Sequence, residues 1–229
     1  MNTGNIRVVL FDAVGTLFDT RVPIGEIYEN VAKRYGSVAS ADSIGLAFLN
    51  QWNLTETPRD KDSWKAMVLS IFKDVGMVDN FDDFFEEIYE VFQASGEWQC
   101  FPETREVLQS LQVTGYHLGV VSNFDDRITG ILRALALESF FDSVTTPYSC
   151  GYAKPDPRIF EAALTSLEVD AGNVLFVGDQ VVEDVRAAEQ AGLNAVLILR
   201  ANKKVPADIQ TVSNLSEVLL MLNISTSSA

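Results

Sequence analysis

From residue 102 onward the chain alternates between strand-like and helix-like segments, and this alternation limits the possible folds more than any other feature. Short apolar runs with the composition of buried strands are separated by segments with apolar residues at helical spacing. The expected strands are 116–122, 142–146, 174–177 and 195–199, and the expected helices are 103–112, 127–135, 157–167, 184–191 and 215–222. Strands connected by helices pair in parallel and are covered on both faces. The sequence therefore predicts an α/β fold with a Rossmann-like, doubly wound parallel sheet.

A block of helical character interrupts this pattern near its start. A first apolar strand is expected at 6–11, and from Asp19 to about Cys100 the apolar residues predict four helices and no strand. The periodicity of the aromatic residues in this block indicates that they are mostly core: Trp52, Trp64, Phe84, Phe85 and Phe92.

This interruption predicts two domains. We expect a Rossmann-like core formed by residues 1–18 and 100–229, and an inserted α-helical domain formed by residues 19–99. Segments near 19–23 and 96–102 contain glycine and proline, as expected where the chain crosses from one domain to the other.

Composition excludes several classes of partner. The chain has 229 residues, of which 47% are apolar, and this is enough for a substantial core. A net charge of −15 would repel nucleic acids and anionic membranes, and the apolar runs are shorter than the roughly 20 residues of a membrane helix. Cys100 and Cys150 do not have the spacing of a metal site and indicate a reducing compartment. We expect a cytoplasmic protein without nucleic-acid or membrane partners; its oligomeric state stays open.

Polar residues follow the carboxyl ends of the predicted strands, where open α/β sheets bind their ligands. Each of these residues alone has an ordinary explanation as a turn residue or a helix cap. Their gathering at one edge of a sheet has no such ordinary explanation. The residues concerned are Asp12, Thr16, Ser122, Asn123, Lys154, Asp179 and Asp184.

These residue types together favour phosphoryl transfer. Three carboxylates that lie close together repel one another unless a cation joins them, and oxygen ligands on loops suit Mg²⁺. The remaining side chains, those of Thr16, Ser122, Asn123 and Lys154, can donate to the oxygens of a phosphate. Positioning and charge neutralisation of this kind are the main requirements of phosphoryl transfer. A small phosphorylated molecule is therefore the expected substrate.

Four ordered segments resemble the motifs of the haloacid dehalogenase-like hydrolase superfamily: 11–17, 121–123, 154–155 and 178–184. Their order, together with a helical insertion after the first motif, resembles subfamily I, whose members carry an α-helical cap. The resemblance implies that Asp12 attacks phosphorus and forms an aspartyl phosphate, which water then hydrolyses.

The resemblance also implies a role for each remaining residue. Mg²⁺ would be held by the side chains of Asp12, Asp179 and Asp184 and by the backbone carbonyl of Val14. Thr16 and Ser122 would bind the phosphoryl group. Lys154 would neutralise both the nucleophile and the transferring oxygens.

One position departs from the pattern of the superfamily. Most of its phosphatases have a second Asp two residues after the nucleophile as general acid and base, whereas this chain has Val14. Because a general acid or base typically increases the reaction rate by a factor of about 10²–10⁴, we expect slow turnover without one.

Two alternatives stay open. One is a metal-independent 2-haloacid dehalogenase, because those enzymes also lack an acid at that position. However, they resemble this chain less in the fourth motif, where Asp179 and Asp184 are typical of a metal site. The other is a catalytically weak or inactive binding or scaffold protein with the same fold, for which Val14 is the best support.

Overall fold

The computed structural model describes residues 3–54, 58, 60–200 and 205–224. The contacts between residues divide the chain into two compact units. The first, here called the sheet unit, comprises Met1–Asp19, Cys100–Asn123 and Ala136–Ala229. The second, the helical unit, comprises Thr20–Gln99 and Phe124–Leu135. Among the described residues, no helix is both long enough and apolar enough to cross a membrane.

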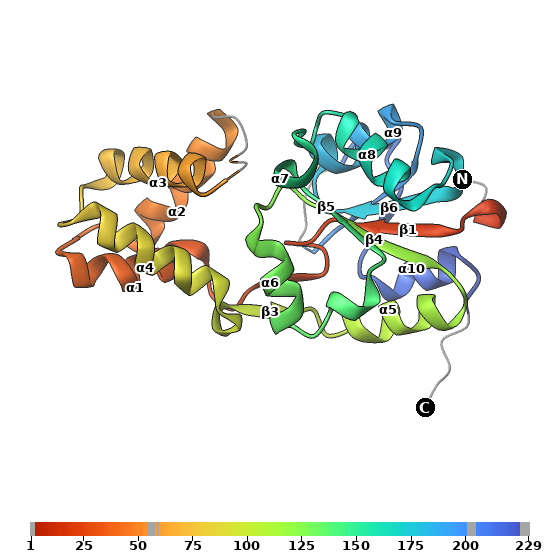
Figure 1. Ribbon diagram of the computed structural model, residues 1–229, viewed down its shortest axis with the longest axis horizontal. Helices are drawn as coiled ribbons and strands as arrows, with labels where there is room; N and C mark the ends of the chain where they lie inside the picture. The colour runs from red at the N-terminus through yellow and green to blue at the C-terminus, as the bar shows by residue number, and fades with distance from the viewer. Residues whose placement is uncertain (1–2, 55–57, 59, 201–204, 225–229) are drawn as a thin grey trace. The chain divides into compact units, whose positions relative to one another are not determined.

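The sheet unit is built on six strands in the order β5-β4-β1-β6-β7-β8. All of these neighbours pair in parallel. Figure 1 labels β1, β4, β5 and β6 of this sheet. The strands are β1 Val8–Phe11, β4 His117–Val121, β5 Ser143–Thr145, β6 Val174–Gly178, β7 Asn194–Ile198 and β8 Thr211–Val212. The order reverses at β1, because β4 lies on one side of it and β6 on the other. This arrangement confirms the predicted α/β fold. In open sheets of this kind, ligands bind outside the carboxyl ends of the strands where the order reverses, which here are those of β1, β4 and β6.

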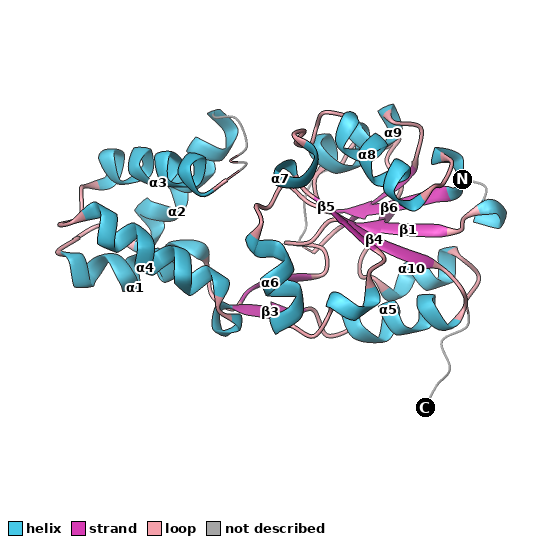
Figure 2. Ribbon diagram, in the orientation of Figure 1, coloured by secondary structure: helices cyan, strands magenta, loops and turns pink. Residues whose placement is uncertain are grey.

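Helices cover both faces of this sheet. Figure 2 shows α8 and α9 on one side of the strands and α5 and α10 on the other. The helices of the sheet unit are α5 Thr104–Val113, α7 Pro147–Cys150, α8 Arg158–Leu167, α9 Ala187–Gln190 and α10 Ser216–Met221, with 3-10 turns at Thr3–Asn5, Glu138–Phe140 and Ala171–Asn173. Since both faces are covered, every residue of β1 and β6 is buried. The rings of Phe160 and Phe176 lie 4.9 Å apart in the core between α8 and β6.

The segment after β6 differs from its prediction. A regular helix was expected at 184–191, but the chain forms a π-helical stretch over Val181–Arg186 and becomes α-helical only from Ala187. The wide turn begins with hydrogen bonds from the backbone N–H groups of Asp184 and Val185 to the carbonyl of Gln180. Such π-helical turns occur frequently at functional sites.

The helical unit contains α1 Ile24–Ala32, α2 Ala41–Leu54, α3 Lys61–Val75, α4 Phe81–Gln93 and α6 Arg127–Ala134, with 3-10 turns at Lys33–Tyr35 and Ser95–Glu97. In the described part of the predicted block, α1 to α4 are the four expected helices. The expectation of no strand was wrong, because β2 Phe18–Thr20 pairs with β3 Trp98–Cys100 where the block begins and ends. Strands of three residues are too short to produce a periodic signal.

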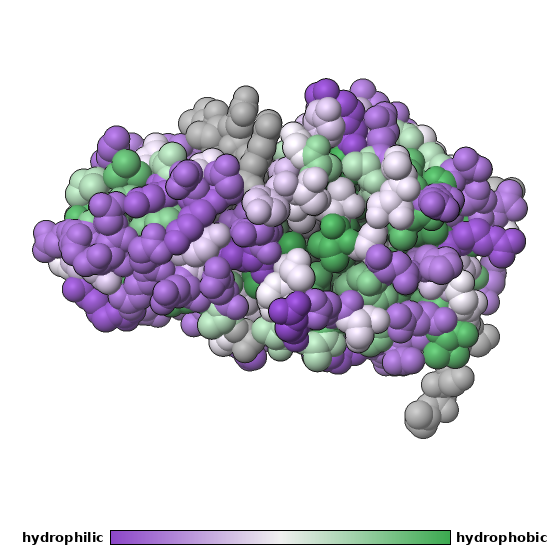
Figure 3. All heavy atoms as spheres, in the orientation of Figure 1, coloured by the Kyte–Doolittle hydropathy of each residue, from purple (hydrophilic) through white to green (hydrophobic). Residues whose placement is uncertain are grey.

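Aromatic side chains form much of the core of the helical unit. Trp64, Phe84, Phe85 and Phe92 are buried as predicted, whereas Trp52 is 39% exposed. The visible surface over α4 is mainly hydrophilic (Figure 3). The division into a core and a cap of residues 19–99 stays a prediction. The helical unit defined by the contacts also includes α6, which lies outside these limits in sequence.

Candidate active site

The turn after β1 carries the predicted nucleophile. Asp12 continues the sheet, because its N–H donates to the carbonyl of Val177 at 2.9 Å. The chain then turns sharply, with the N–H of Leu17 bonded to the carbonyl of Ala13 at 2.8 Å. Gly15 has a φ of +84°, and a Cβ at this position would lie 2.9 Å from the carboxylate carbon of Asp179. Only glycine therefore allows both this turn and the approach of Asp179.

The register of the sheet brings the other predicted residues to the same edge. Phe11 lies opposite Val120 on one side and Val177 on the other. Asp12, Ser122 and Asp179 follow these positions closely in sequence. Parallel strands all present their carboxyl ends at one edge, so these residues meet although they are far apart in the chain.

Lys154 lies at the centre of the cluster. Its Nζ is 2.6 Å from Asp12 Oδ1 and 2.6 Å from Asp184 Oδ1. All three residues are buried, with exposed fractions of 4% for Lys154, 7% for Asp12 and 1% for Asp184. Charge-assisted hydrogen bonds of this kind are strong, and they hold the ammonium group against two carboxylates.

The backbone around Lys154 is fixed by a second side chain. Asn123 Nδ2 donates to the carbonyl of Lys154 at 2.8 Å, and Asn123 Oδ1 accepts from the N–H of Lys154 at 2.7 Å. The amide of Asn123 is thus engaged in positioning Lys154. Its predicted role as a substrate ligand stays a prediction.

Three carboxylates form a group suited to a metal ion. Asp12, Asp179 and Asp184 each offer an oxygen atom, and these atoms lie within 4.8 Å of one another. Three ionised carboxylates and the ammonium of Lys154 have a net charge of −3 + 1 = −2, which a divalent cation would balance. The donor set, made of oxygen only, fits Mg²⁺.

Glycine also makes room for the third carboxylate. A Cβ at Gly178 would lie 2.4 Å from the carboxylate carbon of Asp184. The N–H of Gln180 donates to Asp184 Oδ2 at 2.9 Å, so the π-helical turn and the missing side chain at position 178 together orient Asp184.

Burial and charge set the protonation of the cluster. Burial raises the pKa of Asp12 to about 7; the charge of Lys154 opposes this shift, while those of Asp184 and Asp179 add to it. Burial would lower the pKa of Lys154, but the charges of Asp12 and Asp184 outweigh it and raise that pKa above its usual range. Lys154 is therefore a stable cation at neutral pH. A bound divalent cation would favour the ionised form of Asp12.

The two predicted hydroxyl ligands are both buried in the sheet unit. Thr16 is 0% exposed and Ser122 is 3% exposed. Thr16 Oγ1 has no hydrogen-bond partner within the described part of the chain. A buried polar group without a partner costs about 1–3 kcal/mol, so a ligand oxygen that binds this hydroxyl would remove the penalty.

No acid occupies the position two residues after Asp12. Val14 is half-buried there, and its backbone forms an isolated bridge with Phe18. An aliphatic side chain cannot transfer a proton. Its backbone carbonyl stays a predicted metal ligand.

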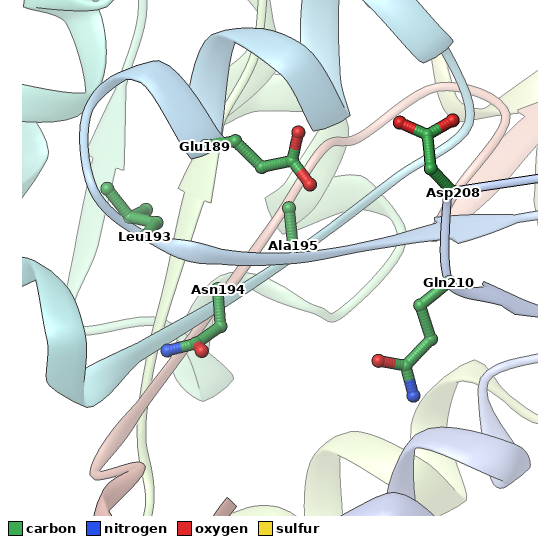
Figure 4. A pocket seen from close by; sticks show the side chains of 6 residues that line it. All are labelled: Glu189, Leu193, Asn194, Ala195, Asp208 and Gln210. Carbon is green, nitrogen blue, oxygen red and sulfur yellow. The ribbon is translucent and has the colours of Figure 1, made fainter. Parts of the chain in front are cut away.

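A separate pocket lies at the opposite end of the sheet (Figure 4). Asn194, which begins β7, lines it together with Glu189 and Asp208. Both carboxylates are already paired with Arg186, at 2.9 Å and 2.5 Å. No predicted site residue lines this pocket, so it is not part of the acidic cluster described above.

Sequence reasoning missed Arg200, which follows β7. Its Nη2 donates to the backbone carbonyl of Thr16 at 2.6 Å, so it contacts the turn that carries the nucleophile. The available signal was its position at the carboxyl end of a strand, the same rule that selected Asp12.

The fold and this cluster define a class of protein: an α/β protein with a group of acidic side chains at the edge of a Rossmann-like sheet and a block of helices after the first strand. The family model of haloacid dehalogenase-like hydrolases matches residues 6–192. The chain belongs to this family.

Relatives of known sequence agree with this assignment. Haloacid dehalogenase-like hydrolase domain-containing protein 3 of Xenopus laevis is 31% identical over 218 residues, which cover 90% of this chain and 88% of that protein. The human protein of the same name is 29% identical over 206 residues, covering 85% of this chain and 82% of its own. The segments 121–125 and 154–160 of this chain also resemble this branch of the family.

The solved structures that resemble this chain include enzymes that catalyse different reactions. A haloacid dehalogenase-like phosphatase from Thermococcus onnurineus is 26% identical, with a TM-score of 0.72 over 96% of this chain and 100% of that one. A 2-haloacid dehalogenase from Pseudomonas syringae is also 26% identical, with a TM-score of 0.70 over 95% and 98%. The choice between these reactions therefore depends on the residues of this chain.

Proposed function

We propose that the protein is a Mg²⁺-dependent phosphatase that hydrolyses a small phosphorylated metabolite through an aspartyl phosphate on Asp12. The observation that carries this proposal is the group of carboxylate oxygens of Asp12, Asp179 and Asp184 within 4.8 Å of one another. A metal-independent dehalogenase would not need a group of three carboxylates that can hold a cation. Bound Mg²⁺ would supply charge neutralisation and polarise the phosphoryl oxygens.

The first step is the attack of a carboxylate oxygen of Asp12 on phosphorus. A bond forms between this oxygen and phosphorus, and the bond from phosphorus to the ester oxygen breaks, with its electron pair going to the leaving group. Lys154, 2.6 Å from the Asp12 carboxylate, would neutralise negative charge on the transferring oxygens. The hydroxyls of Thr16 and Ser122 would donate to the same phosphoryl group.

The second step returns the enzyme to its starting state. Water attacks the phosphorus of the aspartyl phosphate, the bond from phosphorus to the Asp12 oxygen breaks, and inorganic phosphate leaves. Both steps involve a proton that the residue at position 14 would handle in most phosphatases of the superfamily. Val14 cannot do so. The enzyme is therefore slow with poor leaving groups and prefers those that leave as stable anions.

A panel of phosphate esters and 2-haloacids, each with Mg²⁺ and with EDTA, tests the proposal. We expect phosphate from an activated aryl phosphate only with Mg²⁺, and no halide. Halide release without metal, with all phosphates untouched, would establish the dehalogenase instead. Neither product from any substrate would favour the scaffold protein. We also propose that the protein acts in the cytoplasm and that its substrate is a small molecule.

A further inference from the structure

Arg200 connects the turn after Asp12 to two other parts of the sheet unit. Its Nη2 donates to the backbone carbonyl of Thr16 at 2.6 Å, and its Nη1 binds the carboxylate of Glu103. The guanidinium carbon lies 3.6 Å from the ring centroid of Phe101. Glu103 Oε1 also accepts from the N–H of Leu215 at 3.2 Å, just before α10.

These contacts fix the guanidinium in one orientation. The side chain of Arg200 is only 20% exposed, and that of Glu103 is 16% exposed. A planar guanidinium stacks flat on a ring while its nitrogens donate in fixed directions, whereas the ammonium of lysine has neither a plane to stack nor a rigid fork of donors. The hydrogen bond to Thr16 is therefore a charge-assisted bond from a group that is itself held in place.

The carbonyl that Arg200 holds belongs to the residue with the unpartnered hydroxyl. Thr16 is fully buried, and its Oγ1 has no partner in the described part of the chain. The next carbonyl, that of Leu17, accepts from Thr104 Oγ1 at 2.6 Å and from the N–H of Phe101 at 3.2 Å. Residues distant in sequence thus fix both peptide groups of the turn and leave the Thr16 hydroxyl available.

We infer that Arg200 is a positioning residue for phosphoryl transfer, acting through Thr16. This inference rests on the proposed function. By holding the Thr16 carbonyl, Arg200 sets the direction of the Thr16 hydroxyl toward the phosphoryl group. Misplacement of a catalytic contact by about 1 Å can cost about 100-fold in rate. A contact that strengthens in the transition state affects kcat more than KM.

The test compares Arg200→Lys with Arg105→Lys as a matched control. Arg105 Nη1 also donates to a backbone carbonyl in the sheet unit, that of Ala136, at 3.0 Å. We expect Arg200→Lys to lower kcat by about 10- to 100-fold with little change in KM, and to weaken binding of orthovanadate, a mimic of the transferring phosphoryl group, by a similar factor. Arg105→Lys should leave both unchanged.

A double-mutant cycle separates positioning from general stability. If Arg200 acts through the Thr16 hydroxyl, Arg200→Lys should cost much less in a Thr16→Val background, because coupled residues are not additive. Additive losses would overturn the inference, and so would an Arg200→Lys variant that matches the control. If Arg200→Lys does not fold, the same cycle is run with Glu103→Gln, which keeps the arginine but weakens its anchor. Wild-type protein that neither releases phosphate nor binds orthovanadate would overturn the proposed function itself.

Discussion

Lys154 Nζ lies 2.6 Å from the carboxylate of Asp12, although 142 residues separate the two in sequence. The same nitrogen lies 2.6 Å from Asp184. A buried cation between two carboxylates, with a third carboxylate nearby, is the feature from which the following predictions derive.

Replacement of Asp12 by Asn should abolish phosphate release. The amide keeps the size of the side chain but cannot form an aspartyl phosphate. The measurement is the rate of phosphate release from an activated aryl phosphate with Mg²⁺. Asp208→Asn, which changes an exposed acid at the opposite end of the sheet, is the matched control and should keep full activity. Substantial activity in Asp12→Asn would show that another residue is the nucleophile.

Installing an acid at position 14 should accelerate the reaction. Val14→Asp would supply the proton donor that the site lacks, and a general acid is worth about 10²–10⁴ in rate. The gain should be largest for alkyl phosphates, whose leaving groups need a proton. Val14→Asn is the control of equal size without an ionisable group. If both variants remain as slow as the wild type, or lose activity, proton transfer is not the missing function.

The stability of the metal-free protein should fall as pH rises toward neutrality. The pKa of Asp12 is raised from 3.8 to about 7 by burial, so the folded state holds this proton more tightly than the unfolded state. The stabilisation from this proton is complete below pH 3.8 and is lost as pH rises through about 7. This effect is measured as the change in melting temperature, in EDTA, from about pH 5 to about pH 8. Over this range the folded state loses the proton of Asp12.

Asp12→Asn removes that titration and serves as the comparison. Its melting temperature should fall less than that of the wild type over the same pH range. Mg²⁺ should restore the stability of the wild type at the higher pH, because it binds the ionised carboxylates of the folded state. Identical pH profiles for the two proteins would contradict this explanation.

Loss of the buried ion pair in the helical unit should destabilise the fold. Arg127 and Asp125 are 5% and 3% exposed, and the guanidinium carbon lies 4.0 Å from the ring centroid of Tyr89. Arg127→Met leaves the Asp125 carboxylate buried without its cation, at a cost of about 3–5 kcal/mol. Urea denaturation measures the change in the free energy of unfolding.

The chain contains a natural control for this prediction. Asp156 and Arg158 have the same spacing and the same bidentate contact, but their side chains are 30% and 55% exposed to solvent. Arg158→Met should therefore change stability little, since exposed ion pairs contribute little. Equal effects of the two substitutions would mean that burial does not determine the contribution of the pair.

The sequence was sufficient to predict the parallel sheet and the gathering of Asp12, Lys154, Asp179 and Asp184. Both follow from local patterns, because buried parallel strands are apolar runs and their carboxyl ends meet at one edge. The short strands β2 and β3 escaped prediction because three residues have no periodicity. The π-helical turn depends on the contacts of Asp184 with Gln180, and no pattern of apolar residues encodes these contacts.

The contacts of Arg200 and Arg127 could not be predicted for a related reason. Each depends on partners brought together by the tertiary fold, such as Arg200 with Thr16, 184 residues away. Asn123 shows the same limit: its side chain holds the backbone of Lys154, a contact that no sequence pattern indicates, and its role in binding substrate stays a prediction. Sequence patterns predicted which edge of the sheet carries the site. The side chains that hold other site residues in place, such as Asn123 and Arg200, are identified only by the structure.

The dependence of phosphate release on Mg²⁺ tests the central claim most directly. Wild-type protein, freed of metal with EDTA and then titrated with Mg²⁺, should release phosphate from an activated aryl phosphate at a rate that rises from background to saturation. Asp179→Asn, which removes one carboxylate of the proposed metal site, should require more Mg²⁺ for the same rate. Release of phosphate that is equally fast in EDTA, or no release at any Mg²⁺ concentration, would contradict a metal-assisted phosphatase at Asp12.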